Sequence, residues 1–211
     1  QTGIDSIELR RRNFILPDQF PYSSPGNLTY DSGDYDATLT SALLAIDYDN
    51  FESRKNKSLQ EGKVRGLGIS CYIEACGVAP SKMTLEAGGR GGYYESSTVR
   101  VNPTGSVTVF TGSHSHGQGH ETVFAQIVHE TLGIPFDSID IVHGDTGRVP
   151  YGVGTVGSRS LAVGGPALMR SLDKIIAKGK KIAAHILEAQ EDEMNFENGE
   201  FSIKGTNKFV T

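Results

Sequence analysis

The protein has 211 residues, of which 37% are hydrophobic and 21% are charged, and its formal net charge is -5. These values are ordinary for a globular protein that buries a hydrophobic core. The acidic balance argues against a nucleic-acid partner, which would require a basic surface. No stretch approaches the roughly 20 consecutive apolar residues that a membrane-spanning helix needs.

The first part of the chain is predicted to be helical and irregular. Asp34 or Asp36 is placed to cap a helix that runs to about Lys55 and carries an apolar stripe. The other elements expected here are a short helix over 4–12, a loop rich in proline and serine over 17–27, and a polar connection over 54–63.

From Val64 onward the pattern becomes one of strands and amphipathic helices. Apolar residues recur from Val64 to Val78 as in a strand, and Asn198-Gly199 is typical of a hairpin turn. The remaining expected elements are strands over 93–101, 106–111 and 138–142, helices over 121–131 and 160–189 (the second softened near 164–166), and a hairpin over 194–210. This order predicts an α+β fold in which mixed sheets pack against two or more long helices.

Cysteine and glycine usage adds two expectations. Cys71 and Cys76 lie in an apolar, strand-like run, so we expect buried thiols and, from their reduced state, a cytoplasmic compartment. Glycine is used where the backbone adopts positive φ or approaches a ligand closely. The 26 glycines gather at 88–92, 112–119, 144–157 and 164–165. We expect the first of these clusters to be a mobile surface loop.

The segment 111–120 lies between a predicted strand and the start of a predicted helix. The first amides of a helix lack internal partners and carry partial positive charge, so small residues here let an anion reach them. Gln118 adds an amide group to this segment, and Thr122 adds a hydroxyl. A plain strand–helix connection is one alternative. A zinc site is another, made of three histidines, His114, His116 and His120, but no carboxylate or thiolate completes the set.

The segment 152–157 matches the pattern G-x-G-x-x-G of dinucleotide-binding folds. A Rossmann interpretation fails because Pro150 and a polar loop precede the glycines, and no second strand follows the helix. What remains is a set of donors at a helix start, residues 158–160, suited to a phosphate or pyrophosphate. Arg159 could fork onto two oxygens. As an alternative, Ser160 could serve only as an N-cap.

Several segments in order resemble the molybdenum-binding large subunit of the xanthine oxidase family. The nearest branch is the large subunit of aerobic carbon monoxide dehydrogenase and its relatives. The segments that carry the resemblance are 8–15, 20–22, 62–68, 117–126, 134–137, 143–146 and 151–160. Together they extend it over about residues 4–205, and the ordered series is more specific than any single segment.

The resemblance implies a cofactor and the residues that contact it. In the family, the two glycine-rich segments lie against molybdopterin, which in bacteria and archaea is usually the cytosine dinucleotide form. The implied contacts are Gln118, Gly119, His120, Thr122, Thr155, Gly157, Ser158, Arg159 and Ser160. We therefore predict an N-terminal helical and extended segment over 1–60 and a partial α+β molybdopterin-binding domain over 61–211.

The resemblance further implies an oxidoreductase that oxidises a small molecule with water as the oxygen donor. Its expected partners are an iron–sulfur subunit, an FAD subunit and the remainder of the molybdenum subunit, in an oligomer. The family's catalytic glutamate follows a Gly-x-Gly sequence that does not occur here, so no catalytic residue is assigned. The chain starts at Gln1 without a methionine and is several times shorter than a complete subunit. These features predict a middle segment that is inactive alone; the alternative is a non-catalytic scaffold or cofactor-binding module.

Overall fold

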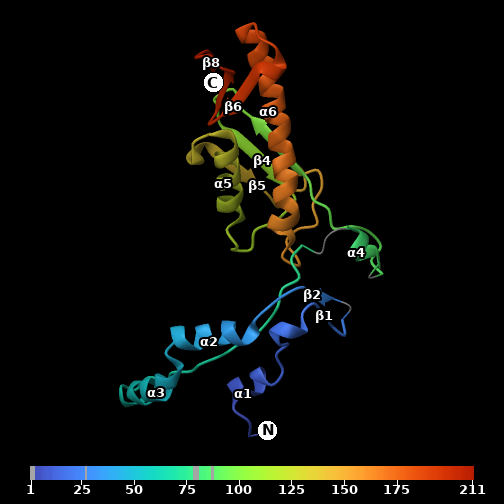
Figure 1. The fold of residues 1–211 in the computed structure, drawn as a ribbon. Helices are drawn as coiled ribbons and strands as arrows, with labels where there is room; N and C mark the ends of the chain where they lie inside the picture. The colour runs from blue at the N-terminus through green and yellow to red at the C-terminus, as the bar shows by residue number, and fades with distance from the viewer. Residues whose placement is uncertain (1–2, 27, 78–80, 87) are drawn as a thin grey trace. The chain divides into compact units, whose positions relative to one another are not determined.

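A computed structural model describes residues 3–26, 28–77, 81–86 and 88–211. The chain divides by compactness into two units, Gln1–Cys71 and Tyr72–Thr211, whose elements are labelled in Figure 1. The functional division predicted after residue 60 stays a prediction. Within the described residues, no helix is both long enough and apolar enough to cross a membrane.

The first unit consists of short helices and one small hairpin. Its elements are α1 (Ser6–Arg11), a 3-10 turn (Pro17–Gln19), β1 (Tyr22–Ser23), β2 (Thr29–Tyr30), α2 (Tyr35–Ala45), a second 3-10 turn (Tyr48–Asn50) and α3 (Phe51–Gln60). The Asp34 carboxylate caps α2 by accepting from the Ala37 amide. Of the described hydrophobic residues in this unit, only Ile7 and Leu39 are buried. The first unit therefore has a very small core.

The single helix predicted up to Lys55 is wrong, because the chain turns between α2 and α3. Asp47 adopts a left-handed backbone with φ 51° at this turn. Arg54 holds the turn by donating to the Asp47 carboxylate at 2.5 Å and to the Ile46 carbonyl at 2.6 Å. The aspartates and asparagine of the turn, residues 47–50, compete with helix formation through local hydrogen bonds, which the apolar spacing did not reveal.

The strand predicted from Val64 to Val78 does not form over the described residues 64–77, and Val78 lies outside the described residues. A strand requires a neighbour that exchanges backbone hydrogen bonds with it, and within the first unit no described segment makes such bonds with residues 64–71. Cys71 and Cys76 are exposed free thiols. The prediction of buried thiols is therefore wrong in this structure, for the same reason.

The second unit contains two small sheets connected by one long helix. Its elements are α4 (Ser81–Glu86), β3 (Ser97–Val101), β4 (Val107–Thr111), α5 (His120–Leu132), a 3-10 turn (Phe136–Ser138), β5 (Ile139–Val142), a π-helical turn (Ser160–Gly164), α6 (Gly165–Leu187), a last 3-10 turn (Glu191–Glu193), β6 (Met194–Glu197), β7 (Glu200–Ile203) and β8 (Phe209–Val210). The glycine cluster 88–92 lies in the irregular stretch before β3.

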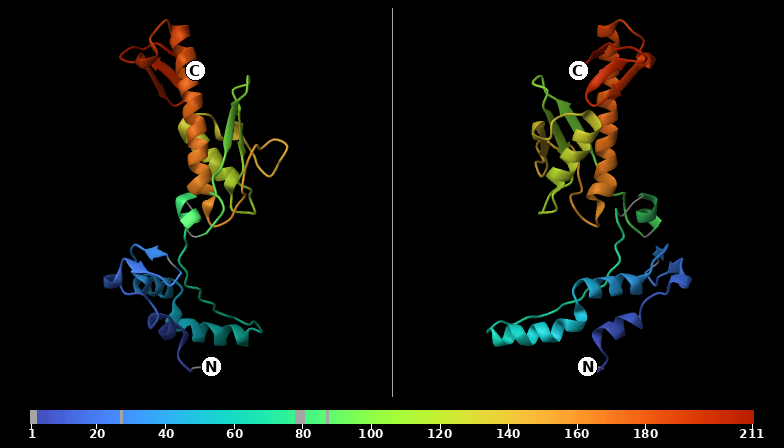
Figure 2. Two further views of the ribbon diagram at one scale, coloured as in Figure 1. Left: turned by 90° about the vertical axis from the view of Figure 1, so that its right-hand side faces the viewer. Right: turned by 60° about the vertical axis from the view of Figure 1, so that its left-hand side comes forward.

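The larger sheet has the order β3-β4-β5. β3 and β4 are antiparallel, whereas β4 and β5 are parallel with Val109 opposite Ile141. Both α5 and α6 pack beside this sheet (Figure 2). The core residues from the sheet and the two helices are Val107, Val109, Phe124, Val128, Leu132, Leu168 and Leu172. Because β4 and β5 run in the same direction, the loops that follow them leave from the same end of the sheet, where both strands have their carboxyl ends.

The smaller sheet has the order β6-β7-β8 and packs on the C-terminal half of α6, where Ala183, Ala184 and Met194 are buried. The hairpin predicted around Asn198-Gly199 is confirmed, and both residues have positive φ, as a two-residue turn of this kind requires. The softening predicted in the long helix is a π-helical turn before α6. The predicted hairpin over β3 and β4, the helix α5, the strand β5 and the α+β class are confirmed.

Gly179 of α6 provides a test of how tightly the smaller sheet packs on this helix. A Cβ at position 179 would overlap the ring of Phe201 on β7. Gly-to-Ala exchange inside a helix normally stabilises by about 1 kcal/mol. Here we expect Gly179→Ala to lower the free energy of unfolding by about 1–3 kcal/mol, because the ring must move.

Urea unfolding of the wild type, Gly179→Ala and the double variant Gly179→Ala/Phe201→Ala measures this effect. Phe201→Ala alone is the control for the loss of the ring. In that background the added methyl group should be neutral or stabilising, because the obstacle is gone. A stabilising effect of Gly179→Ala in the wild-type background would contradict the packing.

Candidate functional site

The loops that follow β4 and β5 meet at one edge of the larger sheet. We call residues 112–119 the β4 loop and residues 143–159 the β5 loop. A Cβ on Gly112 would overlap the backbone of Gly152, and a Cβ on Gly152 would overlap that of Gly112. Only glycine permits two main chains to lie this close. Ser96 Oγ adds a hydrogen bond of 2.6 Å to the Tyr151 carbonyl and so ties the β5 loop to the start of β3.

Thr155 connects the β4 loop with the start of the last long helix. Its Oγ1 donates to the His114 carbonyl at 2.5 Å and lies 2.9 Å from Ser160 Oγ. Ser160 begins the π-helical turn, a rare conformation that is frequent at functional sites. Since its hydroxyl pairs with Thr155 and the turn has no side-chain cap, the interpretation of Ser160 as an N-cap is wrong.

The N-terminus of α5 has no N-cap side chain, and the Glu121 carboxylate accepts from its own backbone N–H there. The N-cap residue is Gly119, with φ 76°. Because glycine has no side chain, the helix has no side-chain cap at this position. A Cβ on Gly117 or Gly119 would meet no atom within 4 Å, so the space beside the loop is free. The first amides of α5 carry partial positive charge, which favours an anion at this point.

His120, the first residue of α5, is buried, and its Nδ1 has no hydrogen-bond partner among the described residues. Burial lowers the pKa of His120 below its ordinary value of 6.5. The ring is therefore neutral at pH 7. A buried polar nitrogen without a partner is unusual in folded proteins and is explained when a ligand supplies the partner.

Arg159 lies beneath the loops in a fully buried ion pair. Its Nη1 contacts Glu95 Oε2 at 2.8 Å, and neither side chain is exposed to solvent. The same guanidinium donates to the carbonyls of Tyr93, Tyr94 and Gly154 at 2.8, 2.9 and 2.8 Å. A single side chain thus connects the irregular segment before β3 with the β5 loop.

This placement of Arg159 differs from the forked contact with a ligand that we predicted. The guanidinium donates to a carboxylate and to carbonyl groups of the protein itself. In this structure it therefore positions the loops of the site. Glu95 accepts from the Ser96 amide at 3.0 Å and from Ser113 Oγ at 3.4 Å. The pair therefore also reaches the β4 loop.

A chain of hydrogen bonds runs along the rim of the site from Glu121 to His143 and His114. His143 Nε2 lies 2.8 Å from Glu121 Oε1, and its Nδ1 lies 3.0 Å from His114 Nδ1. The pKa of Glu121 is lowered first by its own backbone N–H at the helix start and then by His143. Among the described residues, no group of three histidine, cysteine or acidic side chains is arranged to hold a metal ion.

The residues predicted to contact a ligand differ in exposure. Gln118, Thr122 and Ser158 are exposed, Gly119, Thr155 and Gly157 are half-buried, and His120, Arg159 and Ser160 are buried. Gln118 Oε1 accepts from the His116 amide, and Ser158 Oγ donates to Glu74. The Gly157 carbonyl accepts from the Gly77 amide at 2.9 Å. The structure thus brings His114, Thr155 and Ser160 together, while Ser158 faces the segment before α4.

Sequence reasoning missed Glu95 and the pair of Glu121 and His143. Glu95 precedes Arg159 by 64 positions, and no spacing rule connects a lone acid at that distance with an arginine. Glu121 and His143 each occur beside a residue that the sequence did single out. The approach of the two loops at the edge of a parallel strand pair was the signal that could have joined them.

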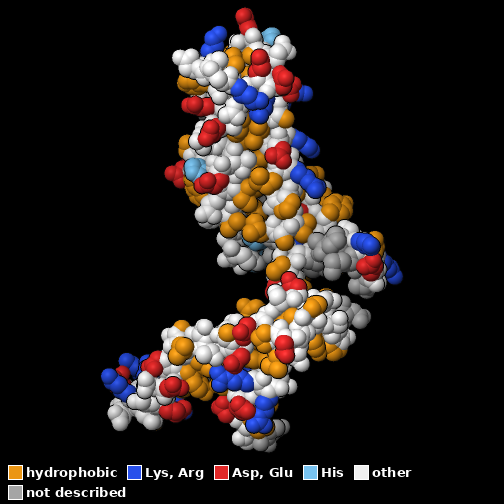
Figure 3. Space-filling model, viewed as in Figure 1, with side chains coloured by type: hydrophobic (Ala, Val, Ile, Leu, Met, Phe, Trp, Pro, Cys, Tyr) orange, Lys and Arg blue, Asp and Glu red, His pale blue; other side chains and the backbone are white. Residues whose placement is uncertain are grey.

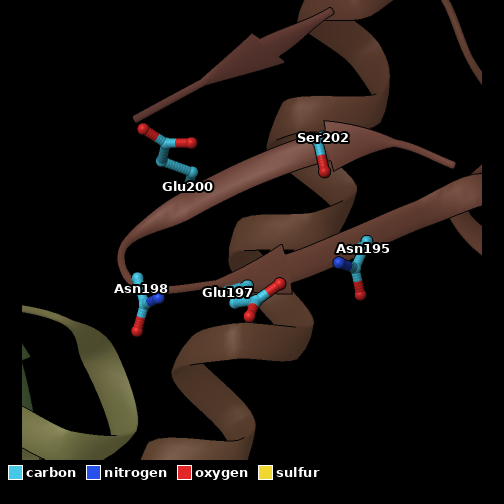
Figure 4. Close-up of a pocket in the computed structure, with 5 residues that line it drawn as sticks. All are labelled: Asn195, Glu197, Asn198, Glu200 and Ser202. Carbon is cyan, nitrogen blue, oxygen red and sulfur yellow. The ribbon is translucent and has the colours of Figure 1, made fainter. Parts of the chain in front are cut away.

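The hollow in Figure 4 lies elsewhere, on the β6–β7 hairpin. It is lined by Asn195, Glu197, Asn198, Glu200 and Ser202. The carboxylates of Glu197 and Glu200 disfavour an anion there, and none of the predicted site residues belongs to it.

Comparison with known proteins gives a consistent result. Residues 41–211 match the family described as the molybdopterin cofactor-binding domain. The carbon monoxide dehydrogenase large chain of Hydrogenophaga pseudoflava is 40% identical over 99% of this chain, which covers 26% of that relative. The nicotine 6-hydroxylase large subunit of Paenarthrobacter nicotinovorans is 34% identical over 96% of this chain and 24% of its own length.

Solved structures agree in fold. A Cu,Mo-CO dehydrogenase in the carbon monoxide reduced state matches with a TM-score of 0.68 and 40% identity, over 99% of this chain and 27% of that one. Quinoline 2-oxidoreductase from Pseudomonas putida 86 matches with a TM-score of 0.68 and 32% identity, over 96% of this chain and 26% of its own. The chain spans about a quarter of the length of these relatives. It belongs to the molybdopterin cofactor-binding domain family and corresponds to a segment of the molybdenum-binding large subunit of the xanthine oxidase and carbon monoxide dehydrogenase group.

Proposed function

We propose that the β4 loop and the β5 loop together form one wall of a binding site for molybdopterin cytosine dinucleotide. One observation carries the proposal: Thr155 joins the β4 loop, which leads into the glycine-capped N-terminus of α5, to the start of the π-helical turn. A pyrophosphate placed there would accept hydrogen bonds from backbone amides and from hydroxyl groups of both loops. The donor set therefore fits an anionic dinucleotide.

The predicted contacts take different roles in this proposal. Gly119 keeps the approach to the amides of α5 open, and the amide group of Gln118 and the hydroxyl of Thr122 donate at the rim. Ser160 supplies a hydroxyl from the second side, beside Gly157. Thr155 and Ser158 belong to the same side; their hydroxyls donate here to the His114 carbonyl and to Glu74, and a ligand oxygen would have to replace these acceptors. His120 fits as well, because its buried Nδ1 lacks a partner among the described residues. Arg159 acts as a positioning residue rather than as a direct contact.

The molybdenum of the bound cofactor would supply the oxidation chemistry. We propose that the complete protein oxidises a small molecule with water as oxygen donor, supported by the oxidoreductase relatives. An iron–sulfur subunit, an FAD subunit and the remainder of the molybdenum subunit are the proposed partners. This chain contributes binding and orientation of the dinucleotide. Since its sequence lacks the Gly-x-Gly-Glu context of the family's base, we expect it to be inactive alone.

A non-catalytic scaffold or cofactor-binding module is the second candidate. The two candidates differ in the complete subunit. We expect purified complete subunit, assembled with its partners, to hold molybdenum and to oxidise a substrate. Stoichiometric molybdenum without turnover of any aldehyde, purine or carbon monoxide would favour the module.

Thr155→Val tests the junction of the two loops. The change removes the hydroxyl that binds the His114 carbonyl and Ser160 while keeping the shape of the side chain. We expect about a tenfold loss of cofactor affinity in the complete large subunit, which corresponds to roughly 1.4 kcal/mol for the lost hydrogen bonds. Molybdenum and cytidine nucleotide per subunit, measured after dialysis, report the loss. Thr98→Val, at an exposed position of β3, is the matched control; equal cofactor retention in both variants would contradict the role of Thr155.

Replacement of Arg159 tests the buried ion pair. Arg159→Met leaves the Glu95 carboxylate buried without its partner, which typically costs about 3–5 kcal/mol of unfolding free energy. The additional change Glu95→Gln should recover part of this loss, because the uncompensated charge is then removed.

Denaturant unfolding of the single and double variants measures both effects. Arg170→Met, at an exposed position of α6, serves as the control and should change stability by less than about 0.5 kcal/mol. If Arg159→Met behaved like this control, the pair would not organise the site.

A further inference from the structure

Four of the six histidines of the chain lie around the start of α5. His114 and His116 belong to the β4 loop, His120 begins the helix, and His143 begins the β5 loop. All six histidines are in the second unit, on which histidine side chains reach the surface (pale blue in Figure 3). Of the four, the proposed cofactor contacts include only His120. His114 and His143 instead form a hydrogen-bonded chain with Glu121.

The chemistry of Glu121 fixes the direction of this chain. A carboxylate can only accept hydrogen bonds, and Glu121 is ionised because its own backbone N–H and then His143 lower its pKa. His143 must therefore donate from Nε2, which lies 2.8 Å from Glu121 Oε1. In a neutral imidazole one nitrogen donates and the other accepts. His143 Nδ1 is consequently an acceptor.

The same rule carries over from His143 to His114. Their two Nδ1 atoms lie 3.0 Å apart, and since His143 Nδ1 accepts, His114 Nδ1 donates. The Nε2 atom of His114 then keeps its lone pair. Among the described residues, no group forms a hydrogen bond with that nitrogen. Glu121 thus acts through His143 to give His114 a single tautomer, in which Nε2 is an acceptor.

The ring of His114 is exposed but held in place. The His143 side chain that binds it is only 15% exposed and is itself restrained. A Cβ on Gly144 would lie 2.8 Å from His114 Nδ1, so the β5 loop packs directly on the ring. The His114 carbonyl accepts from Thr155 on its other side. A side chain held in this way loses little conformational entropy when a ligand binds it.

We infer that His114 is a binding residue whose Nε2 accepts a hydrogen bond from an N–H or O–H group of the bound dinucleotide, and that Glu121 and His143 position it. A lone pair repels phosphate oxygens, so this point takes an uncharged part of the ligand. It complements the amide and hydroxyl donors proposed for the pyrophosphate. The inference rests on the proposed function, because it takes the dinucleotide as the ligand.

Diethylpyrocarbonate tests the acceptor, because it modifies an imidazole nitrogen through its lone pair. In the complete large subunit, we expect His114 to react at least about tenfold more slowly with the cofactor bound than after its removal. Peptide mass spectrometry separates this reaction from that of His185, an exposed histidine of α6 that serves as the reference. Equal rates for His114 in the two states would overturn the inference.

Replacements of His143 test the positioning role. His143→Gln can donate to Glu121 and accept from His114 Nδ1, as the neutral imidazole does, so we expect it to lose less than about threefold in cofactor affinity. His143→Leu fills the same largely buried space without either bond, and we expect about a tenfold loss. Molybdenum per complete subunit after dialysis measures both. A role in packing alone predicts the reverse order, which would overturn the inference.

A double-mutant cycle shows whether His143 acts through His114. His114→Leu alone should lower cofactor affinity about tenfold. Adding His143→Leu should then cost less than about a further twofold, because the side chain that His143 positions is gone. Losses that multiply to about 100-fold would mean that the two residues act independently, which contradicts the positioning role.

Cytidine diphosphate shows which half of the dinucleotide supplies the donor. If it is the nucleoside, His114→Leu should weaken binding of this probe to the cofactor-free complete subunit about tenfold, as measured by calorimetry. Unchanged binding of the probe together with loss of the whole cofactor assigns the donor to the pterin. Unchanged affinity for both would overturn the inference.

The inference and the proposed function fail in different ways. A wild-type subunit that retains molybdenum and cytidine nucleotide while His114 reacts at equal rates in both states overturns the inference alone. A wild-type subunit that retains neither overturns the proposed function, and the inference with it.

Discussion

The buried ion pair of Arg159 and Glu95 is the interaction on which the candidate site depends. Moving two charges out of water is costly, and the cost is offset only where geometry is good and the remaining donors are used. Here the guanidinium also donates to three carbonyls, those of Tyr93, Tyr94 and Gly154, and its buried Nε has no partner among the described residues. These bonds fix the irregular segment before β3 against the loop after β5. The hydroxyl and amide donors above the pair are held in place as a consequence.

The second constraint is the close approach of the β4 loop and the β5 loop. The parallel pairing of β4 and β5 places both loops at one sheet edge, and glycine at 112 and 152 lets their main chains touch. Thr155 then bonds across the junction to the His114 carbonyl. The N-terminus of α5 follows the same loop, so the site that we propose would offer an anion donors from two loops.

The two units of the chain differ in how much hydrophobic surface each buries within itself. The second unit buries a core between its larger sheet and two helices, with Val107, Val109 and Leu172 fully buried. The first unit buries little: within it, no described strand pairs with residues 64–71, and Val64 is exposed. The wrong predictions for Val64–Val78, Cys71 and Cys76 therefore share a single physical cause.

The sequence by itself determined what local chemistry and periodicity decide. Alternation and turn residues located the hairpin of β3 and β4 and the turn at Asn198-Gly199, and helical spacing located α5 and α6. Ordered motifs located the family and both glycine-rich loops. Only the tertiary structure decided that Arg159 is buried on Glu95, that Thr155 bonds to Ser160, and that His143 joins Glu121 to His114. These pairs are separated along the chain or depend on the path of irregular loops, and such contacts leave no periodic trace in the sequence. The break at Asp47 and the unpaired backbone of residues 64–71 were hidden for a related reason: helical and strand patterns describe which faces are apolar, whereas the neighbours available to them are set by the fold.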